Sequence, residues 1–168
     1  YMSSSTHAGN PLLISDERAR EDGWIVCTFE PCPQAVFDAT RAARMRRSLL
    51  SEAHRALRSS ARLRDRCERF RHEQAWWLQP HAHFETLKHL HGSKGWWQWP
   101  PGLHAVDSRA TRKTLQQHGA VTERAVLAQL LFHEQWGALK RYCNDRRILL
   151  VGDVPIYVGH DSADVWAN

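Results

Sequence analysis

Acidic residues gather near the end of the sequence, directly after a short apolar run. The run Ile148–Val151 is aliphatic at every position, as expected for a parallel strand that is covered on both faces. Asp153 follows at its carboxyl end, and Asp161, Asp164 and Trp166 come soon after. Carboxylates there could accept hydrogen bonds from sugar hydroxyls or hold a catalytic group, and the indole could stack on a sugar ring. The simpler interpretations are a capping role for Asp153 and a core position for Trp166.

Eleven histidines raise the question of a metal site. The closest pairs stand two positions apart, a spacing that directs side chains to different faces of a helix; they are His81 with His83 and His89 with His91. His133 and Glu134 open like a zinc-protease motif, but Gly137 stands where its second histidine belongs. We therefore predict surface histidines, no metal and no cofactor.

Positive charge is concentrated in one segment of the sequence. The formal net charge of the whole sequence is +5. The segment from Arg41 to Arg71 contains eleven arginines and only three acidic residues, Glu52, Asp65 and Glu68, so its own net charge is +8. Such a segment could bind nucleic acid. No aromatic platform for stacking on bases is interleaved with the arginines, which favours a solvated helix face and no nucleic-acid partner.

The composition is that of a globular chain with a core. Of 168 residues, 42% are hydrophobic and 24% charged, and no apolar run approaches the length of a membrane span. We therefore expect no membrane partner. The four cysteines lack zinc-site spacing, and we predict reduced thiols and a cytoplasmic location. Because the first residue is Tyr1 rather than Met, we expect the true N-terminus to lie upstream.

The elements that would position these side chains are mostly helical. Residues 34–91 carry apolar stripes at helical spacing, which are Val36, Ala39, Ala43, Leu50, Ala53 and Leu57, then Leu63, Cys67 and Phe70. Ser60 is the expected N-cap of the second helix. A third is predicted to start at Pro80, bury Phe84, Leu87 and Leu90, and stop at Gly92.

A longer helix is expected from Thr122 to about Asn144, with an apolar face that includes Leu127, Leu130, Leu131, Ala138, Leu139 and Tyr142. The buried strand at residues 148–151 would follow it. A parallel strand needs neighbours, and the sequence contains no second convincing core strand. We therefore predict an α/β fold in which this chain is a piece of a larger barrel.

Two motifs at opposite ends of the sequence carry a family resemblance. Residues 152–158, Gly-Asp-Val-Pro-Ile-Tyr-Val, and 161–166, Asp-Ser-Ala-Asp-Val-Trp, resemble the signature of the amylomaltases, the 4-α-glucanotransferases of glycoside hydrolase family 77. Tyr1, Ser3, Ser5 and residues 8–14, Ala-Gly-Asn-Pro-Leu-Leu-Ile, are similar to a loop of that family. Between them, matching residues fall in the family's order: Trp77-Leu78, Phe84, Leu87-Lys88, Trp97, Trp99-Pro100, Phe132, Gln135-Trp136 and Leu139-Lys140.

The resemblance implies an internal fragment of a (β/α)₈ TIM barrel with an inserted, mostly α-helical subdomain. Residues 1–33 would be the substrate-loop region after barrel strand two, and residues 34–120 the helical insertion. Residues 121–168 would supply a barrel helix, strand three and its C-terminal loop. The implied substrate-binding residues are Tyr1, Ser5, Gly9, Asn10, Asp153, Asp161 and Trp166.

The family transfers a segment of an α-1,4-glucan to the 4-hydroxyl of an acceptor by retaining double displacement. The resemblance implies that the Asp nucleophile and the Glu acid/base lie beyond Asn168, so the chain alone should be inactive. The expected partners are α-1,4-glucans and maltooligosaccharides. Three alternatives stay open: an α-glucan hydrolase of the same barrel superfamily, a non-catalytic glucan-binding module and a nucleic-acid-binding module.

Overall fold

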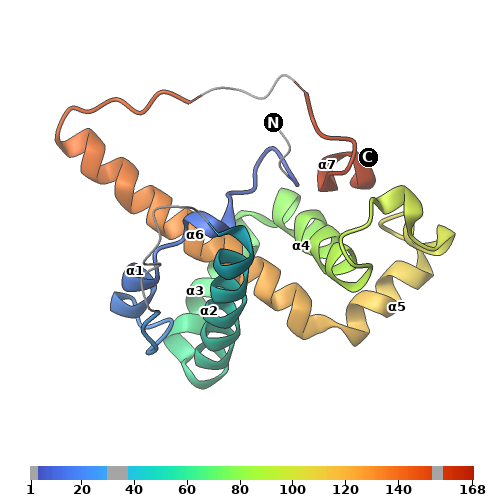
Figure 1. Ribbon diagram of the computed structural model, residues 1–168, viewed down its shortest axis with the longest axis horizontal. Coiled ribbons are helices and arrows are strands. Elements are labelled where there is room, and N and C mark those ends of the chain that lie inside the picture. The colour runs from blue at the N-terminus through green and yellow to red at the C-terminus, as the bar shows by residue number, and fades with distance from the viewer. Residues whose placement is uncertain (1–3, 30–37, 153–156) are drawn as a thin grey trace. The chain divides into compact units, whose positions relative to one another are not determined.

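The computed structural model describes residues 4–29, 38–152 and 157–168, and every regular element in these ranges is a helix. Figure 1 labels the α-helices in chain order. The 3₁₀ helices are η1 (Pro11–Leu13), η2 (Trp96–Gln98) and η3 (Pro101–Leu103). The α-helices are α1 (Asp16–Glu21), α2 (Ala39–Ser59), α3 (Ala61–Glu73), α4 (Ala75–Leu90), α5 (Arg109–Gln117), α6 (Gly119–Asp145) and α7 (Ala163–Ala167).

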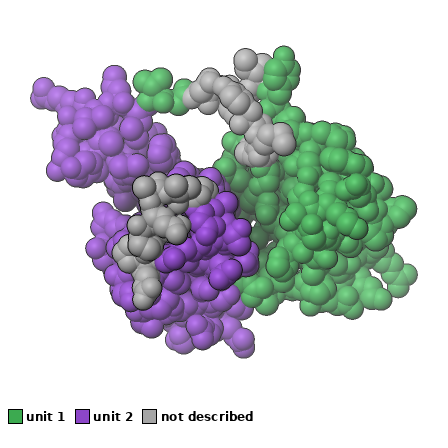
Figure 2. All heavy atoms as spheres, in the orientation of Figure 1, with its two compact units in different colours: residues 1–8, 71–126, 151–168 green, residues 9–70, 127–150 purple. Residues whose placement is uncertain are grey.

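The chain forms two compact units, and each gathers segments that are far apart in the sequence (Figure 2). Unit 1 comprises residues 1–8, 71–126 and 151–168, and unit 2 comprises residues 9–70 and 127–150. Helix α6 contributes its first part to unit 1 and the rest to unit 2.

Helices α2 and α3 of unit 2 meet at Ser60, which confirms the predicted N-cap. The Ser60 N–H donates to the last turn of α2, at the carbonyl of Ala56, and its Oγ accepts from the N–H of Leu63 at 3.4 Å. The predicted stripe of α3 is buried as expected, at Leu63, Cys67 and Phe70. In α2 the buried positions are Leu49, Ala53 and Leu57. Leu49 replaces the predicted Leu50 because it stands four residues before Ala53, on the same helix face.

Helix α4 of unit 1 begins at Ala75, so the predicted start at Pro80 is wrong. Pro80 lies inside the helix, where it lacks the N–H that would bond to the carbonyl of Trp76. The apolar residues before the proline explain the difference, because Trp77 and Leu78 are both buried in helical positions. The predicted end is confirmed: Gly92, just past the helix, has φ +63°, a conformation that glycine adopts without strain.

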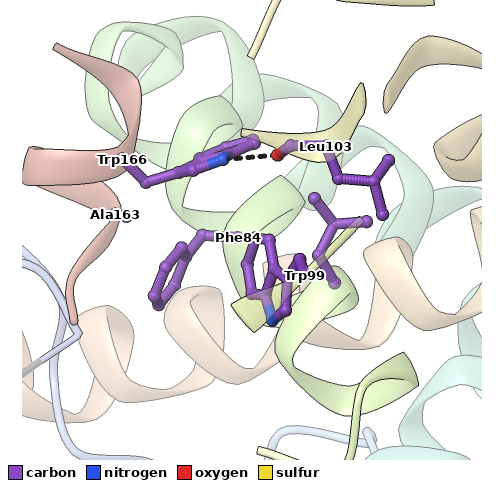
Figure 3. Close-up of a cluster of buried hydrophobic side chains, with 6 residues drawn as sticks. Phe84, Trp99, Leu103, Ala163 and Trp166 are labelled. Carbon is purple, nitrogen blue, oxygen red and sulfur yellow. Dashed lines mark hydrogen bonds between the residues drawn. The ribbon is translucent and has the colours of Figure 1, made fainter. Parts of the chain in front are cut away.

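The core of unit 1 joins α4, the 3₁₀ turns and α7 (Figure 3). The Phe84 ring lies 5.5 Å from the Trp99 ring and 6.0 Å from the Trp166 ring, between ring centroids. Trp166 is 4% exposed, and its Nε1 donates to the Leu103 carbonyl at 2.9 Å. The indole N–H is therefore satisfied where it is buried. Leu87 and Ala163 complete this core.

The predicted strand at residues 148–151 is absent, although α6 before it confirms the predicted helix and starts three residues earlier. These four residues are exposed, Leu149 to 86% and Val151 to 94%. The physical reason is the lack of a partner, because no other described segment is in strand conformation. The described residues therefore form helices only, and the sheet of the expected α/β fold is not present among them.

Two further expectations concern cysteines and membranes. Cys27 and Cys143 are free thiols, as predicted, and Cys32 lies outside the described residues. In the described ranges, no helix combines the length and the hydropathy that crossing a bilayer requires.

Candidate functional site

The two motifs at opposite ends of the sequence meet in unit 1. The Ser5 hydroxyl donates to Oδ1 of Asp164 at 2.9 Å, and the Thr6 N–H donates to its Oδ2 at 2.7 Å. The N–H of Ala163 donates to the Ser4 carbonyl at 2.7 Å. Both carboxylate oxygens of Asp164 are thus occupied in fixing the N-terminal loop to α7. Ser5, an expected substrate-binding residue, is buried in this junction.

Asp161, the second predicted carboxylate of this region, forms an ion pair with Lys88 of α4. Its other oxygen accepts from the Trp96 N–H at 3.4 Å. The Lys88 ammonium also donates to the carbonyls of Ser93 and Lys94, at 3.1 and 3.2 Å. The lysine therefore joins the end of α4, the loop after it and the segment before α7. The Asp161 side chain stays partly open to solvent.

An exposed aromatic pair, Trp97 and His160, stands beside Asp161; the family resemblance includes Trp97, but no contact between these two residues was predicted from the sequence. The rings of Trp97 and His160 are stacked, with centroids 4.8 Å apart and planes at 29°. Trp96 fixes the backbone of this segment, because its Nε1 donates to the His160 carbonyl at 2.8 Å. Trp97 is 47% exposed. The three tryptophans at positions 96, 97 and 99 were a usable signal in the sequence.

His81 of α4 is a buried titratable group in the same unit. It packs near Trp77, with ring centroids 6.0 Å apart, and its Nδ1 finds no hydrogen-bond partner among the described residues. Burial lowers the pKa of His81, while the carboxylates of Glu85 and Asp164 act in the opposite direction. The imidazole is therefore favoured in its neutral form.

In unit 2, the predicted loop residues Gly9 and Asn10 are held by their surroundings. The Gly9 N–H donates to Oε1 of Gln129 at 2.8 Å, and Nε2 of Gln129 donates to the Gly9 carbonyl at 3.1 Å. A methyl group at Gly9 would come within 1.9 Å of the Phe132 ring. Asn10 is exposed and caps η1, since its Oδ1 accepts from the Leu12 N–H at 3.0 Å. Gln129 is 2% exposed, and sequence reasoning missed it although a glutamine in an apolar stretch is a usable signal.

The predicted site residues thus fall into three groups. Ser5, Asp161 and Trp166 belong to unit 1, where each has a defined partner. Gly9 and Asn10 belong to unit 2. Tyr1 and Asp153 lie outside the described residues.

Metal-ligating side chains do not cluster in the described ranges. No group of three or more His, Cys, Asp or Glu residues there has a geometry that could hold a metal ion.

Comparison with known families now defines the class of protein. The family model described as 4-alpha-glucanotransferase, of glycoside hydrolase family 77, matches residues 1–168. The chain belongs to this family.

Individual relatives agree with this assignment. The 4-alpha-glucanotransferase of Thermus thermophilus is 35% identical over 170 residues, covering 100% of this chain and 34% of the relative. The chloroplastic/amyloplastic 4-alpha-glucanotransferase of Solanum tuberosum is 31% identical over 173 residues, covering 100% of this chain and 30% of the relative. A solved structure, the amylomaltase from Streptococcus agalactiae in complex with acarbose, matches with a TM-score of 0.88 and 29% identity. That match covers 99% of this chain and 34% of the amylomaltase. The chain therefore spans about a third of the length of these relatives.

Proposed function

We propose that the full-length protein containing this chain is a 4-α-glucanotransferase. It cleaves an α-1,4-glucan and passes the released segment to the 4-hydroxyl of an acceptor glucan or glucose. The observation that carries the proposal is the family match over all 168 residues, which includes both terminal motifs. The contact of Ser5 with Asp164 supports it, because two motifs far apart in sequence build one structural junction.

The proposed reaction is a retaining double displacement. A carboxylate attacks the anomeric carbon while a carboxylic acid protonates the departing glycosidic oxygen. The acceptor 4-hydroxyl then attacks the glycosyl-enzyme and gives its proton to the same acid, now a base. We place both catalytic groups, an Asp and a Glu, in sequence beyond Asn168. This chain's part is to bind and orient the glucan.

Within this chain we assign glucan contacts to the exposed or partly exposed predicted residues. The Asn10 amide offers sugar hydroxyls both a donor and an acceptor, and the Asp161 carboxylate has lone pairs beyond its ion pair. We add Tyr1 and Asp153, which lie outside the described residues. Gly9 completes the proposed set by fixing the path of the loop, since Gln129 occupies its N–H and its carbonyl. Ser5 and Trp166 are buried, so we propose that they hold the glucan-binding segments in place rather than contact the sugar.

We also propose that residues 148–151 pair as a strand of a (β/α)₈ barrel in the full-length protein. Their exposed aliphatic side chains support this, because such a run is stable in water only when covered. An open groove of about 560 Å³ in unit 2 is mostly apolar, with Phe132, Trp136, Leu139 and Tyr142 among its lining residues. The remaining chain would cover this face.

Incubation of the purified full-length protein with maltotriose tests the activity. Transfer predicts glucose together with maltodextrins longer than maltotriose, at a constant number of reducing ends. Hydrolysis would instead create one new reducing end for each bond cleaved. A steady rise in reducing ends without longer products would identify a hydrolase and contradict the proposal, as would unchanged maltotriose.

We propose a cytoplasmic location, which the free thiols at Cys27 and Cys143 support. The name of the Solanum tuberosum relative places that protein in the chloroplast or amyloplast. Imaging of the tagged full-length protein distinguishes these compartments.

A further inference from the structure

Two glutamines of α6 hold the segment 9–15 of unit 2 in the same manner. Gln129 bonds both backbone groups of Gly9, and Gln135 does the same at Ser15. The Ser15 N–H donates to Oε1 of Gln135 at 2.7 Å, and Nε2 of Gln135 donates to the Ser15 carbonyl at 2.9 Å. The two anchored residues are six positions apart, as are the two glutamines, which span about 9 Å along a helix.

A primary amide suits this task for a chemical reason. It carries one carbonyl acceptor and an NH₂ donor side by side, so it can pair with the N–H and C=O of one residue as a neighbouring strand would. Each glutamine thus pairs with two backbone groups of the loop, and the Ser15 carbonyl also accepts from the Ala19 N–H at 3.2 Å. A substitution by leucine would keep the volume and remove both hydrogen bonds.

The middle of the segment is anchored from α2. Nη2 of Arg46 donates to the Leu12 carbonyl at 3.2 Å and to the Ile14 carbonyl at 2.5 Å. Ile14 itself is buried. Between these anchors Asn10 and Leu13 are exposed, so the segment forms a short arch fixed at both ends and near its middle.

We infer that Gln129 and Gln135 are positioning residues for glucan binding by this arch. The inference rests on the proposed function and on the proposed role of Asn10. The amides of both glutamines hydrogen-bond to the backbone of the arch, and they act by holding the Asn10 amide in place before the sugar arrives. A fixed arch has less conformational freedom to lose on binding, and therefore binds more tightly than a loose one.

The test uses the full-length protein with Gln129→Leu and with Gln135→Leu. We expect the KM for maltotriose, and its Kd measured by calorimetry, to rise about three- to tenfold, since ordering one loop side chain costs about a kcal/mol. The value of kcat should stay within about twofold, because the proposed catalytic groups are untouched. Gln129 is the more buried of the two residues. If Gln129→Leu does not fold, Gln135→Leu alone tests the inference.

Leu63→Val is the matched control, since it removes one methylene group from a buried position of the same unit, on α3. It should lower Tm with KM unchanged. If the glutamine variants raise KM no more than Leu63→Val does at a comparable loss of Tm, they are structural only and the inference is overturned.

A double-mutant cycle with Asn10→Asp measures the coupling between the two positions in Kd. A purely structural role of the glutamines would give no such coupling. Aspartate keeps the oxygen that caps η1 and loses the amide donor. If the glutamines act through Asn10, Gln129→Leu should change Kd less in the Asn10→Asp background than in the parent. Additive effects would contradict the inference. If the parent binds maltotriose without transferring glucose, the proposed function fails, and the Kd values alone still decide the positioning role.

Discussion

Steric crowding, rather than backbone conformation, explains why residue 9 is a glycine. Its φ is not among the positive values of the described glycines, which are at Gly23 and Gly92. The ring of Phe132 occupies the place where a β-carbon would stand. The Gly9 backbone is also bonded on both sides by Gln129, so the loop cannot shift without breaking two hydrogen bonds. Close approach to α6 is therefore what requires glycine here.

Gly9→Ala should destabilise the full-length protein by about 1–3 kcal/mol, because the added methyl overpacks a fixed contact. Thermal unfolding measures the change. Gly137→Ala is the control on the same helix as Phe132. Gly137 lies in the interior of α6, where an added β-carbon would meet the flexible end of Arg141 at 3.4 Å, and alanine favours the helix by about 0.5–1 kcal/mol. An unchanged Tm for Gly9→Ala would show that the loop yields to the methyl.

At the scale of elements, α4 packs a titratable ring into the core of unit 1. His81 is buried on the helix face that also carries Trp77 and Phe84. Burial is the largest cause of its lowered pKa, and it also lowers the pKa of His83 on the same helix. In the unfolded chain these imidazoles regain an ordinary pKa of about 6.5. Below that pH the unfolded state binds more protons than the folded state, so stability falls as the solution is acidified.

We therefore expect the Tm of the full-length protein to fall between pH 7.5 and pH 5.5, and His81→Leu to make this fall shallower. The leucine removes the group that the unfolded state would protonate. His89→Leu, on the exposed side of the same helix, is the matched surface substitution for comparison. Equal slopes for His81→Leu and the parent would assign the acid sensitivity to other groups.

At the scale of the whole molecule, the chain exposes apolar surface that the described residues do not cover. Residues 148–151 and the outer side chains of α6, Trp136, Leu139 and Tyr142, are open to solvent. The chain spans about a third of the length of its relatives. The exposed run and the groove along α6 are therefore where we expect the remaining chain to pack.

Residues 1–168 expressed alone should form no glucose or longer maltodextrins from maltotriose, because the proposed nucleophile and acid/base lie outside them. The amides of residues 149–151 should exchange with solvent within seconds, since they have no ladder partner, whereas the Ile148 N–H donates to the Cys143 carbonyl at 2.9 Å. The full-length protein is the control for both measurements. Sustained transfer by the chain alone would show that the catalytic assignment is wrong, and slow exchange at Leu149 would show that the run is covered.

Local features of the fold could be predicted from the sequence because they depend on residues close together in the chain. The stripe Leu63, Cys67 and Phe70 follows from helical periodicity, and the boundaries at Ser60 and Gly92 follow from capping. The family resemblance was likewise carried by contiguous motifs, and the family match confirms it. The sequence by itself therefore determined the main helices and the class of protein.

Tertiary structure alone decided the features that depend on distant partners. Pro80 lies inside α4 because burial of Trp77 and Leu78 outweighs one lost hydrogen bond. The pairing of Ser5 with Asp164 joins residues 159 positions apart, and that of Gly9 with Gln129 joins residues 120 apart. The aliphatic run at 148–151 has strand character in sequence yet forms no strand, because a strand is completed only by hydrogen bonds to a neighbour.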